Sequence, residues 1–107
     1  MSDAIPRADL TVVDNPERSR FELVRTTPAG PVVLGFLEHH PLPDDASVAV
    51  LPHTVIDRRW RGQGLGEVLV QGAMDHVRST GRTVVPRCWF VVEFLELHPE
   101  YADLRAA

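Results

Sequence analysis

Apolar and polar residues alternate in short runs through the first half of the chain, and a period of two is typical of β-strands. The pattern predicts strands at residues 10–14, 20–25 and 32–38, followed by a proline-containing loop at residues 39–45. The longest extended run, residues 47–57, is apolar on both faces. It therefore predicts a central strand that is covered on both sides.

From residue 65 onward the apolar residues follow the helical period instead. Apolar positions three and four residues apart between Leu65 and Val77 predict an amphipathic helix, and Gly81 is its expected stop. A short strand at residues 83–85 and an apolar helix at residues 88–97 follow. The order of four strands, a helix, a strand and a helix predicts the α/β (α+β) class.

Length and composition describe one ordinary globular domain, with 107 residues of which 44% are apolar and 24% charged. We assign the domain to residues 9–105 and expect residues 1–8 to be disordered. The net charge of −4 argues against nucleic acid or an anionic membrane surface as the main partner. The single cysteine cannot form an internal disulfide, and we find no signal peptide or long apolar span. We therefore expect a cytoplasmic protein, either monomeric or homodimeric.

Residues 59–66, Arg-Trp-Arg-Gly-Gln-Gly-Leu-Gly, place arginines and a glycine-rich turn directly before the predicted helix. Glycines let the backbone approach a phosphate, and a helix start leaves N–H groups unpaired at the positive end of the helix dipole. The chain has no lysine, which excludes a P-loop, and Glu67 stands where the dinucleotide fingerprint needs its third glycine. The segment predicts a different cofactor that carries a pyrophosphate; the alternative is a turn without a ligand.

Within this run, Arg61-x-x-Gly64-x-Gly66 resembles the acetyl-CoA-binding signature of the GNAT N-acetyltransferase superfamily. Three further segments resemble the short, stand-alone GNAT-like proteins: His53-Thr54, Pro86-Arg87-Cys88-Trp89-Phe90-Val91 and His98-Pro99-Glu100-Tyr101. The resemblance implies a GNAT-like mixed sheet of about five strands with two main helices. It also implies that the final strands of the larger members are missing.

The resemblance further implies acetyl-CoA as co-substrate, without a metal. The superfamily binds CoA where two neighbouring parallel strands splay apart, which here are residues 47–57 and 82–85. Pro52 is a candidate cause of the splay, because proline removes a ladder hydrogen bond and often marks a bulge. The expected pantetheine contacts are the backbone groups of Val55, Ile56 and Asp57. The expected pyrophosphate contacts are Arg61, Gly62, Gln63, Gly64, Leu65 and Gly66.

Transfer of an acetyl group from a thioester to an amine needs a deprotonated amine and protonation of the departing CoA thiolate. His53 is the candidate base, because it lies on the strand expected to line the acetyl end and titrates near neutral pH. Cys88, at the predicted start of the second helix, is the candidate nucleophile or general acid. For both residues the alternative is a packed side chain without a catalytic role.

The leading hypothesis is an acetyl-CoA-dependent N-acetyltransferase that acts on an amine of unknown identity. The alternatives are a CoA-binding module without turnover and a structural or interaction protein that keeps the fold. The other aromatic and histidine side chains are expected to be solvated in the loop (His39, His40) or packed (His76, Trp89, Phe90, Phe94).

Overall fold

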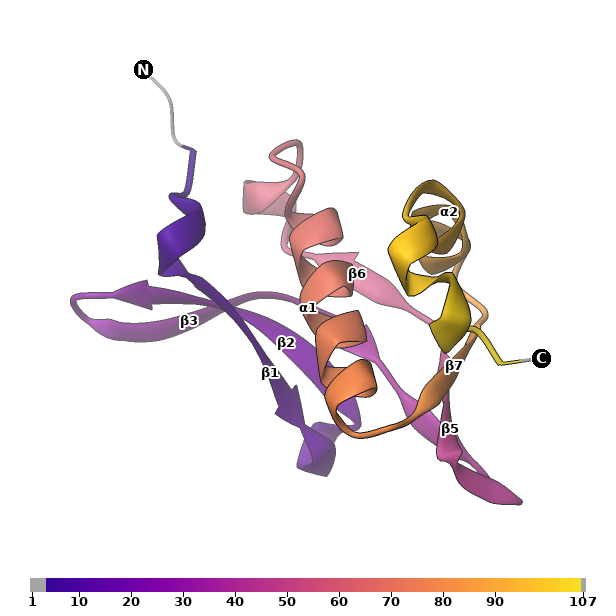
Figure 1. The fold of residues 1–107 in the computed structure, drawn as a ribbon. Helices are drawn as coiled ribbons and strands as arrows, with labels where there is room; N and C mark the ends of the chain where they lie inside the picture. Colours follow the sequence, from indigo (N-terminus) through magenta and orange to yellow (C-terminus); the bar gives the residue numbers. More distant parts are fainter. Residues whose placement is uncertain (1–3, 107) are drawn as a thin grey trace.

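The computed structural model describes residues 4–106, which form two sheets and two α-helices joined by short 3-10 turns (Figure 1). The strands are β1 (Leu10–Asn15), β2 (Arg20–Thr27), β3 (Gly30–Glu38), β4 (His40–Leu42), β5 (Asp45–Leu51), β6 (Thr54–Ile56) and β7 (Thr83–Pro86). The helices are α1 (Leu65–Ser79) and α2 (Trp89–Leu97), and the 3-10 turns are η1 (Arg7–Asp9), η2 (Pro16–Arg18), η3 (Arg58–Trp60) and η4 (Pro99–Leu104). The predicted α/β class and the two main helices are confirmed.

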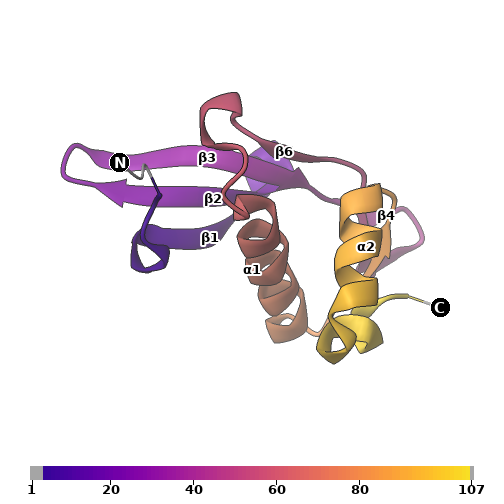
Figure 2. The ribbon, with the colours of Figure 1, turned by 90° about the horizontal axis from the view of Figure 1, so that it is seen from above.

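The first sheet has the strand order β1-β2-β3-β6, and all of its neighbouring strands are antiparallel. Helix α1 packs across one face of this sheet, with α2 beside it (Figure 2). The core between the sheet and α1 contains apolar side chains that are almost fully buried: Leu23, Leu34, Leu37, Leu65, Leu69, Val70, Ala73, Met74 and Val77. Their spacing on α1 is the helical period seen in the sequence. Gly81, with a φ of 71°, follows the helix as expected.

The second sheet has the order β4-β5-β7 and contains the parallel pair β5 and β7. The predicted continuous strand at residues 47–57 is wrong in this respect, because Pro52 and His53 separate β5 from β6. β6 pairs with β3 in the other sheet. The registers leave Glu38 and His39 facing three residues, Leu51 to His53, which is a β-bulge. The predicted loop at residues 39–45 contains β4.

The two ends of the described chain both pack onto the domain. After η4 the chain returns to β7, where the N–H of Ala106 donates to the carbonyl of Val84 at 2.8 Å. Within residues 4–106 this single bridge is all that follows α2 in the sheet. At the other end, we expected disorder over residues 1–8. Residues 1–3 lie outside the described part, but Ile5 is only 5% exposed and belongs to the core.

Candidate functional site

The glycine-rich turn before α1 presents a row of backbone amides without partners. Gly62 and Gly64 have φ values of 85° and 73°, a conformation that side chains with a Cβ rarely adopt. Gly64 is the N-cap of α1 and provides no side-chain cap. Within the described residues, no amide from residue 62 to residue 67 donates a hydrogen bond. Because these N–H groups lie at the positive end of the α1 dipole, the turn is suited to an anion.

Arg61 ties this turn to the end of β6. Its Nε donates to the carbonyl of Ile56 at 3.1 Å, and the rest of the exposed guanidinium stays available. One guanidinium has five N–H donors, so a single bond leaves donors for a phosphate. The arginine of the predicted motif therefore lies beside the free amides.

Two cavities join to form a groove that runs from the turn to the start of α2. The first, of about 350 Å³, is lined by the turn and by Trp60. The second, of about 410 Å³, reaches Thr54 and Cys88. Both are lined by the same four residues: Ile56, Arg61, Gly66 and Phe90. The shared lining makes them one continuous groove, which we call the fork groove.

The floor of the fork groove is the free side of β6. The N–H of Asp57 donates to Leu34 at 2.7 Å, and the carbonyl of His53 accepts from Glu38 at 2.9 Å. Both of these groups face β3. Backbone groups point to alternate sides along a strand, so Val55 also faces β3, whereas Thr54 and Ile56 face the groove. The strand offers amide-binding groups at Ile56 rather than at Asp57.

Gly66 brings the two helices together at the wall of the groove. A Cβ at this position would lie 2.8 Å from Cζ of Phe90, which is closer than real side-chain carbons approach. A side chain at this position would therefore force the Phe90 ring to shift away from the first turn of α1. Gly66 thus contributes to helix packing as well as to the predicted phosphate-binding motif.

Cys88 is the N-cap of α2 and stands at the far end of the fork groove. Its Sγ lies 3.5 Å from the hydroxyl oxygen of Thr54, and its N–H donates to the carbonyl of Leu51 at 3.0 Å. Burial raises the pKa of the thiol, but bonds from the Thr54 hydroxyl and from the N–H groups of Val91, Phe90 and Thr54 outweigh it. The net result is a Cys88 pKa below its ordinary value. The guanidinium of the adjacent Arg87 is not among the causes of this shift.

The sequence of this two-sheet chain matches one family model. Residues 20–104 match the family described as GCN5-related N-acetyl-transferase. The chain belongs to this family. The match covers every strand from β2 onward, both α-helices and the whole of the fork groove. No curated protein sequence matches the chain.

Two solved structures resemble the fold of this GCN5-related protein. A GCN5-like protein from Staphylococcus aureus, solved by NMR, has a TM-score of 0.65 and 19% identity, over 94% of this chain and 91% of that chain. The GNAT family N-acetyltransferase YhbS from Escherichia coli, crystallised in complex with CoA, has a TM-score of 0.50 and 28% identity. That likeness covers 62% of this chain and 38% of the YhbS chain. The predicted GNAT-like fold is confirmed.

Three of the predicted site residues of this GCN5-related chain do not line the fork groove. The carboxylate of Asp57 caps η3, and the Arg59 N–H that it accepts holds its pKa below the ordinary value. Gln63 points to the N-terminal segment, where its Oε1 accepts from the N–H of Ile5 at 3.1 Å. His53 is exposed at the bulge and is absent from the groove lining. Its role as a base stays a prediction.

Trp89 corrects the expectation that the aromatic residues of α2 are all core. The residue is 72% exposed, beside Cys88 at the end of the groove. Phe94, by contrast, is buried and stacks on His98 with 4.1 Å between ring centroids. The run from Cys88 to Leu97 is apolar on most sides, so the sequence alone did not show which side faces solvent.

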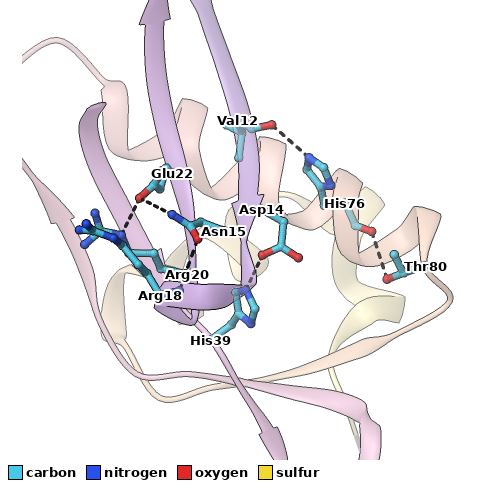
Figure 3. Close-up of polar contacts among 9 residues, drawn as sticks. All are labelled: Val12, Asp14, Asn15, Arg18, Arg20, Glu22, His39, His76 and Thr80. Carbon is cyan, nitrogen blue, oxygen red and sulfur yellow. Dashed lines mark hydrogen bonds and ion pairs between the residues drawn. The ribbon is translucent and has the colours of Figure 1, made fainter. Parts of the chain in front are cut away.

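Two histidines, His39 and His76, lie away from the groove among polar contacts beside β1 (Figure 3). His39, which we expected to be solvated, is 7% exposed, and its Nε2 lies 2.7 Å from Asp14 Oδ1. That expectation was wrong because the bulge turns His39 inward onto Phe21, with 4.5 Å between ring centroids. His76 is packed, as expected, with its Nε2 3.0 Å from the carbonyl of Val12. His40 is exposed, as expected.

Thr54 is the residue of the site whose role the sequence reasoning missed. The available signal was the alternation along β6, which places Thr54 on the same side as Ile56.

Among residues 4–106 no group of three or more His, Cys, Asp or Glu side chains could hold a metal ion. In the same part of the chain, neither helix is both long and apolar enough to span a membrane.

Proposed function

We propose that the protein transfers an acetyl group from acetyl-CoA to an amine, with the CoA lying in the fork groove. One observation carries this proposal: a continuous groove joins six free amides and Arg61 at one end to a thiol with a lowered pKa at the other. Family membership and the CoA-bound YhbS neighbour support acetyl-CoA as the co-substrate. The pyrophosphate then binds residues 61–66, the pantetheine amides bond to Ile56, and the thioester lies at Cys88.

Cys88 acts as the nucleophile in this proposal. The lowered pKa increases the fraction of thiolate, which is the attacking form of a cysteine. The sulfur attacks the acetyl carbonyl carbon, a bond to Cys88 forms, the bond to the CoA sulfur breaks, and CoA leaves as its thiolate. A deprotonated amine then attacks the acetyl-cysteine. It takes the acetyl group, releases a proton and regenerates the Cys88 thiolate.

The groove placement is tested by calorimetry with CoA on the wild type, Arg61→Ala and Arg58→Ala. Loss of a charge-assisted contact costs about 1.5–3 kcal/mol, so we expect about tenfold to hundredfold weaker binding by Arg61→Ala. Arg58, exposed on η3 with no described side-chain bond, is the matched control, and its substitution should leave the affinity unchanged. Equal affinity in all three proteins would show that CoA does not bind at this turn.

Turnover is tested separately, by following CoA release from acetyl-CoA with a panel of small amines and peptide N-termini. Acceleration by one amine, lost in Cys88→Ala, supports a transferase that uses the cysteine. Acceleration that survives in Cys88→Ala indicates direct transfer. A wild type that binds CoA tightly but is not accelerated by any amine indicates a binding module without turnover.

A further inference from the structure

The segment before β1 is fastened onto the glycine-rich turn, although it lies outside the family-matched residues 20–104. Buried Ile5 anchors it in the core, and the N–H of Ile5 donates to the side chain of Gln63 at 3.1 Å. Arg7, in η1, donates from Nη2 to the backbone carbonyl of Gln63 at 3.1 Å. Figure 1 shows this segment and the start of α1 at the same end of the molecule.

The guanidinium of Arg7 lies beside the free amides. Its Nη2 is 3.5 Å from the position that a Cβ on Gly64 would take. Arg7 is exposed and forms no ion pair within residues 4–106, so its positive charge is not neutralised there. The single bond to Gln63 leaves most of its N–H donors unused.

Arg7 and Arg61 approach the turn from different flanks of α1. Arg61 lines the fork groove together with Gly66 and Phe90. Arg7 lines a separate hollow of about 580 Å³ between β1 and α1, with Leu10 and Val68 among its walls. A phosphate bound on the amides between them can therefore meet a guanidinium on each side.

We propose that Arg7 binds a phosphate group of CoA on this turn, so that the N-terminal segment completes the cofactor site. The inference rests on the proposed function and extends it by one residue outside the family match. Arginine suits the role because its planar fork can keep one donor on Gln63 and direct the others to phosphate oxygens. The shared chemistry is a phosphate, which belongs either to the pyrophosphate or to the 3′-phosphate of CoA.

Calorimetry with CoA and dephospho-CoA on the wild type, Arg7→Gln and Arg18→Gln tests the proposal. Glutamine keeps an N–H donor but removes the charge. Arg18, exposed on η2 at the opposite end of β1, is the matched control. We expect Arg7→Gln to weaken CoA binding about tenfold and Arg18→Gln to leave it unchanged. An equal loss with dephospho-CoA assigns Arg7 to the pyrophosphate, and a loss confined to CoA assigns it to the 3′-phosphate.

A second measurement separates phosphate binding from a merely structural role. S-acetylpantetheine carries no phosphate, so Arg7→Gln should acetylate Cys88 from it as fast as the wild type does. Unchanged CoA affinity in Arg7→Gln would overturn the inference, and so would an equal loss with S-acetylpantetheine. Either result leaves the proposed function standing. A wild type that binds neither nucleotide would instead refute the proposed function.

Discussion

The reactivity of Cys88 depends on one residue that is 34 positions away in the sequence. Burial alone would raise the thiol pKa, and the hydroxyl of Thr54 is the first contribution that opposes it. The α2 amides of Phe90 and Val91 add to the same effect. Without the Thr54 hydroxyl, the effect of burial is offset less, and the pKa of Cys88 should rise.

This predicts the pH profile of alkylation at Cys88 by iodoacetamide. Because only the thiolate reacts, a lowered pKa moves the inflection of the rate below that of a free cysteine. Thr54→Val should move the inflection upward. Thr83→Val, the same change on β7 without a described side-chain bond, should not move it. A Thr54→Val profile that overlays the wild type would show that the hydroxyl does not act on the sulfur.

His53 gives a second prediction at this scale. Its side chain does not line the fork groove, so His53→Gln should acetylate Cys88 from acetyl-CoA at the wild-type rate. If His53 is the base, the variant should lose only the transfer to an amine. Intact-protein mass spectrometry measures the first step and CoA release measures the second. Slowed acetylation of Cys88 would contradict the exposed position of His53.

At the level of elements, the joint between α1 and α2 forms the wall of the groove. At this joint Gly66 lies against the ring of Phe90, and a Cβ on Gly66 would force that ring to shift. Overpacking of this kind forces side chains out of their preferred rotamers or shifts the backbone. A substitution at Gly66 should therefore change both the stability of the fold and the shape of the fork groove.

Gly66→Ala should destabilise the protein by about 1–3 kcal/mol in urea unfolding. Phe90→Leu in the same protein removes the ring atoms that the new Cβ meets, so the double variant should lose less than the two single changes added together. Strictly additive losses would mean that Gly66 and Phe90 do not contact each other.

The elements that depend on local sequence were predictable from the chain, and those that depend on distant contacts were not. The glycine turn, α1 and its stop at Gly81 follow from spacing and backbone freedom, and Pro52 indicated the break in the long strand. The pairing of β6 with β3, the burial of His39 and the docking of Ile5 on Gln63 join residues far apart. No local pattern contains that information.

At the scale of the whole molecule, the division of the chain into two sheets creates the site. β5 stays with β7, β6 stays with β3, and Leu51 lies where they part, with its carbonyl accepting from both Arg87 and Cys88. The fork groove lies along β6 of the first sheet and reaches Cys88, which follows β7 of the second sheet. One end holds positive charge and free amides, and the other holds the thiol.

The measurement that tests both ends together is the rate of Cys88 acetylation as a function of acetyl-CoA concentration. The chain has no lysine, so peptide mapping need separate Cys88 only from the N-terminal amine. We predict one acetyl group on Cys88 of the wild type. For Arg61→Ala we predict a half-saturating concentration about tenfold to hundredfold higher with the same maximal rate, because the arginine binds the phosphate and does not touch the thioester. An unmodified Cys88, or identical curves for the two proteins, would contradict the account.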